Sequence, residues 1–381
     1  MLAQSSDPVS DPESSRQLGP VSAAAPTPTF MSLGMVVLDE IHFPDGRVLH
    51  DVPGGSGFYS TLGARLAVPP GEAASVVCLI AAGDDFPQSV ERQIEEWGVT
   101  VHLQETQGKS TRGVLTYHDD TFEKKSFRYA ALPLRPDLAR LPDALVHASA
   151  IHILASPDDL TRQVEDLLAL RSNLGSPKAS VVWEPSPLFC HLGVDNHLIA
   201  AGCVDVVSPN DVELLQIARV TKNPEESWNR RLVENAAAKI SGRQPQTGTS
   251  DASSSRRWVT VIRCGEHGNL TIPRRGDPVW LPPYHDVGSQ RVVDATGAGN
   301  AFLGAFAAVF GTSADEVLAS AYGAVAASFA VEQVGPPRRE VVDGKELWNG
   351  EEFGRRLQEY RAIFAKWDTC LRDREIWTSN P

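Results

Sequence analysis

Short apolar segments alternate with helical patterns along most of this chain, and that alternation constrains the fold more than any other feature. Five of these segments are short enough to be single buried strands: SVVCLIAAG, ASAIHILAS, ASVVWEP, VDVVSPN and RWVTVIRCG. Amphipathic stretches such as QSVERQIEEWG lie between them, and Gly98 is expected to end that helix. Strands that alternate with helices predict an α/β fold, in which a parallel sheet is covered by helices on both faces.

Two segments interrupt the alternation and predict a small separate β-structure. The run SLGMVVLDEIHF predicts a buried strand that leads to Asp39, and EIHFPDGRVLHDV predicts a hairpin that turns at residues 44–46. The segments TRGVLTYHDD and KKSFRYA are expected to pair as two further strands. We therefore expect a lid made of segments near 40–52 and 111–130, on one edge of the main sheet.

Length, charge and cysteine usage restrict the class of protein. Residues 31–381 are long enough for one large domain, whereas the polar residues 1–30 predict a disordered tail and residues 242–257 a flexible insertion. A formal net charge of −13 argues against nucleic-acid and anionic-membrane partners. Five scattered cysteines without a CxxC pair indicate a reducing compartment and no zinc site. With no recognisable signal, presequence or membrane-spanning stretch, we expect a cytoplasmic protein.

The segment RVVDATGAGNAFLGAF, residues 291–306, carries the strongest sign of chemistry. Phe302, Phe306 and Phe310 recur every four positions and predict one face of a helix, so residues 297–299 lie at the helix N-terminus. Unpaired N–H groups and the helix dipole favour an anion there, and small side chains allow a phosphate to approach closely. A plain tight turn into a buried helix is the alternative interpretation.

Two familiar nucleotide motifs are excluded. A dinucleotide fingerprint needs a glycine at the position of Phe302. A P-loop needs a glycine five residues before Gly108, where Leu103 stands, so the GKS at residues 108–110 is expected to belong to the strand pair instead.

Several segments together resemble the ribokinase-like family, also called the PfkB carbohydrate kinases, and are most similar to a fungal branch of it. The matching segments are DATGAGNAFLGAF for the C-terminal signature, PGGSGFYSTLGARLA for the Gly-Gly segment, AAGDDF for the G-x-D-x-x-G stretch, SPNDVE for the N-x-x-E motif and VIRCGEHG for the turn before the nucleotide site. They occur in family order over about residues 31–340. The resemblance implies a doubly wound α/β/α sandwich with a small β lid over the sugar.

The same resemblance implies an ATP- and Mg²⁺-dependent kinase that phosphorylates a hydroxyl of a small sugar or nucleoside-like acceptor. The transferred phosphate would be held by the N–H groups of Gly297, Ala298 and Gly299, and Asn300 would stand beside them at the position of the catalytic base. The acceptor would be bound by Asp39, Gly54 and Gly55. The nucleotide would be bound by Asp294, Gly265 and Asn210. Asn210 and Glu213 would organise the Mg²⁺ shell through water.

Structural roles stay open for several of these residues. Asn210 can cap a helix, and Asp39 can be a solvated strand end. Asp84 and Asp85, in the AAGDDF segment, are more often turn formers than ligands. Glu184 either faces the phosphates through Mg²⁺ or ends its strand.

Two departures from the family pattern put catalysis in question. Asn300 stands where the family has the aspartate that takes the acceptor's proton, and loss of a general base typically costs about 10²–10⁴-fold. The pair Phe58-Tyr59 stands where the family often has a sugar-binding asparagine, which predicts a flatter acceptor or a filled pocket. The second hypothesis is therefore a nucleotide- or ligand-binding pseudokinase that acts as a sensor or scaffold. A homodimer through an exposed lid edge is compatible with both hypotheses.

Overall fold

The computed structural model of the chain describes residues 27–122, 124–221, 227–242 and 257–374. Its main sheet has nine strands in the order β13-β12-β11-β10-β9-β8-β1-β4-β5. The neighbours from β11 to β5 are parallel, whereas β12 and β13 continue the sheet antiparallel. The strands are β1 (Phe30–Ser32), β4 (Val76–Ala82), β5 (Thr100–Glu105), β8 (Ala150–Ala155), β9 (Ser180–Pro185), β10 (Val206–Val207), β11 (Val259–Arg263), β12 (Asn269–Ile272) and β13 (Val279–Leu281).

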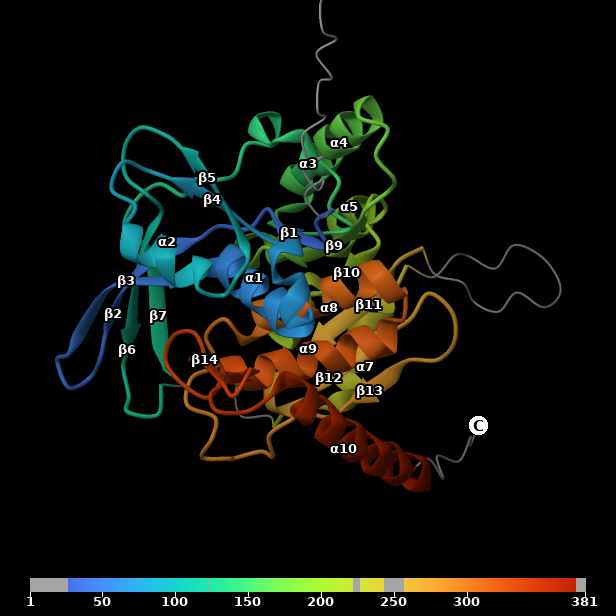
Figure 1. Cartoon of the computed structure of the whole chain (residues 1–381). Helices are drawn as coiled ribbons and strands as arrows, with labels where there is room; N and C mark the ends of the chain where they lie inside the picture. The colour runs from blue at the N-terminus through green and yellow to red at the C-terminus, as the bar shows by residue number, and fades with distance from the viewer. Residues whose placement is uncertain (1–26, 123, 222–226, 243–256, 375–381) are drawn as a thin grey trace, which may run out of the picture.

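Helices cover both faces of this sheet, which confirms the predicted α/β/α sandwich (Figure 1). One face carries α1 (Gly55–Ala67), α8 (Ala298–Ser313) and α9 (Glu316–Ala330), and the other carries α4 (Pro157–Asn173), α6 (Asp211–Ile217) and α7 (Arg230–Ile240). Side chains of a strand alternate between the two faces, so Phe30 packs under α1 and α8 while Met31 packs on the opposite side. The remaining α-helices of the described chain are α2 (Gln88–Glu95), α3 (Asp143–Val146), α5 (Val194–Ala201) and α10 (Phe353–Arg374).

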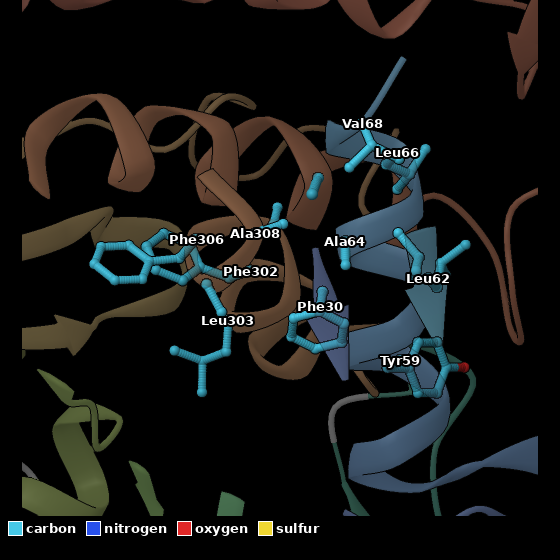
Figure 2. Packing of buried hydrophobic residues seen from close by; sticks show 14 of the residues in the cluster. Phe30, Tyr59, Leu62, Ala64, Leu66, Val68, Phe302, Leu303, Phe306 and Ala308 are labelled. Carbon is cyan, nitrogen blue, oxygen red and sulfur yellow. The ribbon is translucent and has the colours of Figure 1, made fainter. Parts of the chain in front are cut away.

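Helices α1 and α8 meet almost backbone to backbone. A β-carbon added at Gly63 would overlap the carbonyl of Ala301, and one added at Gly304 would overlap the carbonyl of Ser60. Glycine is therefore required on both sides of the contact. Figure 2 shows the apolar cluster around it, with Phe30 of β1 between α1 and α8.

The lid is a separate four-stranded sheet in the order β3-β2-β6-β7 (Figure 1). Its strands are β2 (Val37–His42), β3 (Val48–Gly54), β6 (Arg112–Tyr117) and β7 (Lys125–Tyr129). The hairpin predicted around residues 44–46 joins β2 to β3, and the predicted pairing of β6 with β7 is antiparallel. Strands of this small sheet therefore lie in both segments that the sequence assigns to a lid, and their role as a lid stays a prediction.

The prediction for the run SLGMVVLDEIHF was wrong in one respect. The single strand expected there is two strands: β1 lies in the main sheet and β2 lies in the lid, with residues 33–36 between them. Asp39 therefore lies within a lid strand, not at the end of the first strand. The expectation that the GKS segment joins a strand pair was also wrong, because residues 108–110 lie in the loop between β5 and β6.

Two small features complete the described chain. Strands β14 (Arg339–Val342) and β15 (Lys345–Trp348) form a hairpin before α10. Residues 1–26 of the predicted tail and residues 243–256 of the predicted insertion lie outside the described residues. No helix within the described ranges is long and apolar enough to cross a membrane.

Candidate active site

Polar side chains lie at or directly after the carboxyl ends of β1, β9, β10 and β11, and a fifth lies in the middle of the neighbouring parallel strand β8, under the N-terminus of α8. Each lies two residues beyond an apolar residue that faces α1 and α8, so each points to the same face of the sheet. We call this set the strand-end row: Ser32, His152, Glu184, Ser208 and Arg263. All five are at least nine-tenths buried. Ligands of open α/β sheets bind at the carboxyl ends of the strands, so the row marks the expected place of a site.

Hydrogen bonds and ion pairs link the strand-end row. His152 contacts Ser32 Oγ through Nδ1 at 3.0 Å and Glu184 Oε2 through Nε2 at 3.1 Å. Arg263 Nη2 lies 3.0 Å from Glu184 Oε1 and donates to the carbonyl of Ser208 at 3.0 Å. Burial alone would raise the pKa of Glu184, but the Arg263 guanidinium and the His152 hydrogen bond outweigh it and lower that pKa. Glu184 is therefore a buried, ionised carboxylate.

The predicted glycine turn forms the N-terminus of α8. Gly297 is the N-cap and has a φ of +79°, a left-handed conformation that favours glycine. The ring of Tyr59, which is 4% exposed, lies directly against Gly297, so a side chain there would overlap it. In the first turn, the Asn300 amide donates to Glu184 Oε2 at 2.6 Å. The structure thus connects the turn to the strand-end row through Asn300.

A cavity of about 900 Å³ opens beside this turn. Its wall includes four predicted site residues: Asn210, Gly265, Ala298 and Gly299. Apolar residues such as Phe302, Val293 and Pro283 line other parts of it. Within the part of the chain that the structure describes, Arg263 is the one lysine or arginine that lines this cavity. The carboxyl side chains on its wall are Asp120, Asp211, Glu266 and Asp286, and three of them, all but Asp211, are exposed.

Asn210 and Glu213 form a capping box at the start of α6. The Asn210 side chain accepts from the Glu213 N–H at 2.8 Å, and both Glu213 carboxylate oxygens accept from Asn210, each at 2.8 Å. Burial and the nearby Glu184 charge raise the pKa of Glu213 to about 7, against the influence of Arg263. The sequence-based alternative that Asn210 caps a helix is confirmed.

These residues do not fit a directly coordinated Mg²⁺ ion. The polar atoms of Asn210 and Glu213 are bonded to each other, and the Arg263 guanidinium lies 3.5 Å from Glu213 Oε2, where its charge repels a cation. No cluster of three His, Cys, Asp or Glu side chains suited to a metal occurs in the part of the chain that the structure describes. Contact with a hydrated ion through water, as expected from the sequence, stays a prediction.

The predicted acceptor residues gather on the inner side of the lid, and Asp39 is central among them. Asp39 is 9% exposed and lies against the backbones of Gly54 and Gly113. Among the described residues its Oδ1 has no hydrogen-bond partner, and burial raises its pKa to about 7. Gly55, the other predicted acceptor residue, begins α1, the helix that carries Tyr59.

Asp294 links the lid to the glycine turn. Its carboxylate accepts from the Tyr117 hydroxyl at 2.6 Å, from Lys125 Nζ at 3.0 Å and from the N–H and hydroxyl of Thr296. Tyr117 and Lys125 belong to the paired strands β6 and β7, so two chain segments far apart in sequence meet at this carboxylate. We call these contacts the lid latch: Asp294 with Tyr117, Lys125 and Thr296.

Asp84 and Asp85 hold a loop, as the turn-forming interpretation predicted. Asp84 Oδ2 accepts from the Gly108 N–H at 2.9 Å, and Asp85 accepts from the Ser110 N–H and from Arg112 Nε. The GKS segment is thus fixed by carboxylates.

Sequence reasoning missed several residues of this site. Ser32, His152 and Arg263 received no role, and neither did the latch residues Tyr117 and Lys125. The available signal was positional, since each residue of the strand-end row follows an apolar strand residue by two places.

Comparisons with known proteins show which proteins this chain is similar to. The family described as "pfkB family carbohydrate kinase" matches residues 45–338. An uncharacterized protein of Schizosaccharomyces pombe is 30% identical over 88% of this chain and 93% of its own length. Protein MAK32 of Saccharomyces cerevisiae is 26% identical over 86% of this chain and 90% of its own. The structure of a ribokinase from Cryptococcus neoformans var. grubii in complex with ADP has a TM-score of 0.56 and 20% identity, and covers 81% of this chain and 95% of that one.

Proposed function

The chain belongs to the pfkB family of carbohydrate kinases, and from that premise we propose that it transfers a phosphoryl group from ATP to a hydroxyl of a small sugar or nucleoside-like acceptor. One observation carries the proposal. The N-terminus of the 16-residue helix α8 opens on a 900 Å³ cavity at the carboxyl ends of the strands. Helix N-termini bind phosphate through free N–H groups and the helix dipole.

The residues of this chain divide the work between two sides of the glycine turn. On the cavity side, Ala298 and Gly299 present their backbone to the phosphates, and Asn210 and Gly265 border the nucleotide. On the lid side, the unpaired Oδ1 of Asp39 is an acceptor for a substrate hydroxyl. Mg²⁺ accompanies the ATP phosphates and neutralises part of their charge, as is usual for phosphoryl transfer. Positioning and charge stabilisation supply most of the catalysis in this reaction class.

Tyr59 limits which acceptors fit. Its ring is buried against Gly297, and the charges of Asp39 and Asp294 act on its hydroxyl. The ring therefore lies near both the acceptor carboxylate and the turn that would hold the phosphate. An acceptor has to be small or flat enough to share this space, or Tyr59 has to turn away.

The second candidate function is a pseudokinase that binds a nucleotide without turnover. Two contacts favour it. The Asn300 amide, at the position of the family's proton acceptor, is bonded to Glu184, and Tyr59 fills the space beside Gly297. A sensor or scaffold would keep the nucleotide cavity and need no proton acceptor.

ATP consumption against a panel of sugars and nucleosides separates the two functions. The assay is run with Mg²⁺ on the native protein, on Asn300→Asp, and on Asn300→Asp combined with Glu184→Gln. Asn196→Asp, the same change in exposed α5, is the control. Turnover by the native protein above its background hydrolysis supports the kinase. Turnover only in the double variant identifies a silenced kinase, and ATP binding without turnover in any variant supports the pseudokinase.

Partner and location stay predictions. The expected partners are ATP and the small acceptor, and a homodimer would use the outer lid strands β3 or β7. The cytoplasmic location and the absence of nucleic-acid and membrane partners are inferred from composition alone.

A further inference from the structure

Arg263 is an unusual residue for a buried position at the end of a strand. It ends β11 within an apolar strand, is 8% exposed, and points to the α8 face. Buried arginines are normally satisfied by several acceptors, because an unpaired buried donor costs free energy. Here the Nε atom has no hydrogen-bond partner among the described residues.

Among the described residues, the hydrogen bonds and ion pairs of this guanidinium all use one nitrogen, Nη2. Nη2 contacts the Ser208 carbonyl, Glu184 and Glu213. Nη1 lies directly against Gly299 in the first turn of α8, so that a side chain at Gly299 would overlap it. The guanidinium charge, which the Glu184 carboxylate 3.0 Å from Nη2 partly offsets, therefore lies beside the positive end of the α8 dipole, at one point of the cavity wall.

The charges on the cavity wall determine where an anionic ligand can bind. Arg263 is the one lysine or arginine among the described residues of the wall, and the carboxylates Asp120, Glu266 and Asp286 are exposed on it. An anionic ligand is repelled by those carboxylates and attracted only at the end where Arg263 meets α8. Planar guanidinium donors suit phosphate oxygens, which they bind in pairs.

We propose that Arg263 is the phosphate-binding cation of this protein, and that the bound phosphate takes over the guanidinium from Glu213. The inference rests on the proposed phosphoryl transfer, which it deepens by naming the protein charge that receives the terminal phosphate. Glu213 is the contact that yields, because its 3.5 Å separation from Nη2 is longer than the 3.0 Å contact with Glu184. Glu213 then keeps its two bonds to Asn210.

Calorimetry with three probes tests this assignment: inorganic tripolyphosphate, ATP and adenosine, each in the presence of EDTA and again with Mg²⁺. We expect Arg263→Met to weaken tripolyphosphate and ATP binding by about 10- to 100-fold, the loss typical of a charged hydrogen bond. Adenosine binding should not change. Arg263→Lys keeps the charge without the planar guanidinium group, so its tripolyphosphate affinity should lie between those of the native protein and Arg263→Met.

Glu213→Gln supplies a second measurement that does not depend on removing the arginine. The single amide oxygen of glutamine can still accept from the Asn210 N–H, which keeps the capping box although the bond from the Asn210 amide is lost. Loss of the competing carboxylate should strengthen tripolyphosphate binding. In the Arg263→Met background the same substitution should have a much smaller effect, because its competition acts through the guanidinium. Arg171→Met removes an equally buried arginine on the opposite face of the sheet and controls for general destabilisation. Thermal unfolding confirms that each variant is folded.

The outcomes separate this inference from the proposed function. Equal tripolyphosphate affinity in the native protein and Arg263→Met, or no tripolyphosphate binding by the native protein, overturns the role of Arg263 whatever the kinase assay finds. An equal loss of adenosine and tripolyphosphate binding in a folded Arg263→Met variant also overturns it. Arginine-dependent tripolyphosphate binding in a protein that phosphorylates no acceptor supports the inference and refutes the kinase.

Discussion

Replacing Asn300 by aspartate restores the residue type that the family has at this position, yet the structure predicts that the change harms this protein. The Asn300 amide nitrogen lies 2.6 Å from Glu184 Oε2 and donates to it. Asn300→Asp replaces that donor with a carboxylate oxygen of the same size. Two carboxylates then face each other at a contact where Glu184 is 4% exposed.

The size of the effect follows from this distance. Two unit charges 2.6 Å apart repel by about 6 kcal/mol at an effective dielectric constant of about 20. The pair avoids part of this cost by sharing one proton, as adjacent carboxylates do. Each unit by which this sharing raises the pKa of one carboxyl above its ordinary value costs about 1.4 kcal/mol at a pH above that raised pKa. We therefore expect the free energy of unfolding of Asn300→Asp to be lower by about 3–4 kcal/mol at pH 8.

The pH dependence carries a definite sign. The shared proton raises a folded-state pKa above its unfolded value, so between about pH 4 and that raised pKa the folded state binds more protons. Stability then falls by about 1.4 kcal/mol per pH unit across this window, relative to the native protein, and is not penalised below about pH 4. The cost should therefore be about 1–2 kcal/mol at pH 5 and reach its full value at pH 8.

Urea unfolding at pH 5 and pH 8 measures this difference. The set comprises the native protein, Asn300→Asp, Glu184→Gln and the double variant, with Asn196→Asp as the control for the chemical change alone. We expect the double variant to be more stable at pH 8 than the two single losses added together, because it again holds one carboxylate and one amide. Equal stability of Asn300→Asp and the native protein at pH 8, or the same pH slope for both, refutes the reasoning.

Three further predictions concern the lid and the turn. Burial raises the pKa of Asp39 to about 7, so the free energy of unfolding of the native protein falls as pH rises from about 4 to 7. Asp39→Asn should therefore raise the free energy of unfolding by up to about 4 kcal/mol at pH 8 and leave it unchanged at pH 4, as measured by urea unfolding. Gly297→Ala should cost about 1–2 kcal/mol for the left-handed backbone and more for overlap with Tyr59; in a Tyr59→Ala background only the backbone cost should remain, and equal costs in both backgrounds would contradict the contact. Tyr117→Phe and Lys125→Met each remove a bond to Asp294 and should cost about 1–3 kcal/mol; hydrogen exchange should accelerate in β6 and β7 but not in β8 or β9, and unchanged exchange in the lid would show that the latch does not hold it.

Much of the fold was predictable because hydrophobic periodicity is a local property. The apolar runs that became β4, β8, β9 and β11 are short, separate and flanked by helical patterns, so each was read correctly from its own residues. The same reasoning gave a wrong prediction for the run from Ser32 to Phe43, which was expected to be one strand and is divided between two sheets. Nothing within it states that its first residue pairs with β8 while Val37 and its successors pair with β3 and β6. The assignment of one apolar run to two sheets is decided by partners elsewhere in the chain.

The site was predictable only in part, for the same reason. The glycine turn at 297–299 can be predicted from adjacent residues and from the helical pattern that follows it. The contacts that decide its chemistry join residues far apart in sequence: Asn300 reaches Glu184, and Arg263 reaches both Glu184 and Glu213. Strand order alone brings these residues together, and sequence periodicity does not encode strand order.

The interlocked glycines of α1 and α8 restrict how this site can move and how it can change. Gly63 and Gly304 bring the two helices too close for either to slide along the other. Tyr59 lies in α1, and Gly297 is the N-cap of α8. The Tyr59 ring and the phosphate-binding turn are therefore held by the same rigid pair of helices. Opening of the acceptor space is left to rotation of the Tyr59 side chain or to hinging of the lid strands around it. In a lineage that acquires a larger acceptor, the first substitutions should therefore fall at Tyr59 and in the lid, while the glycines of this pair of helices stay unchanged.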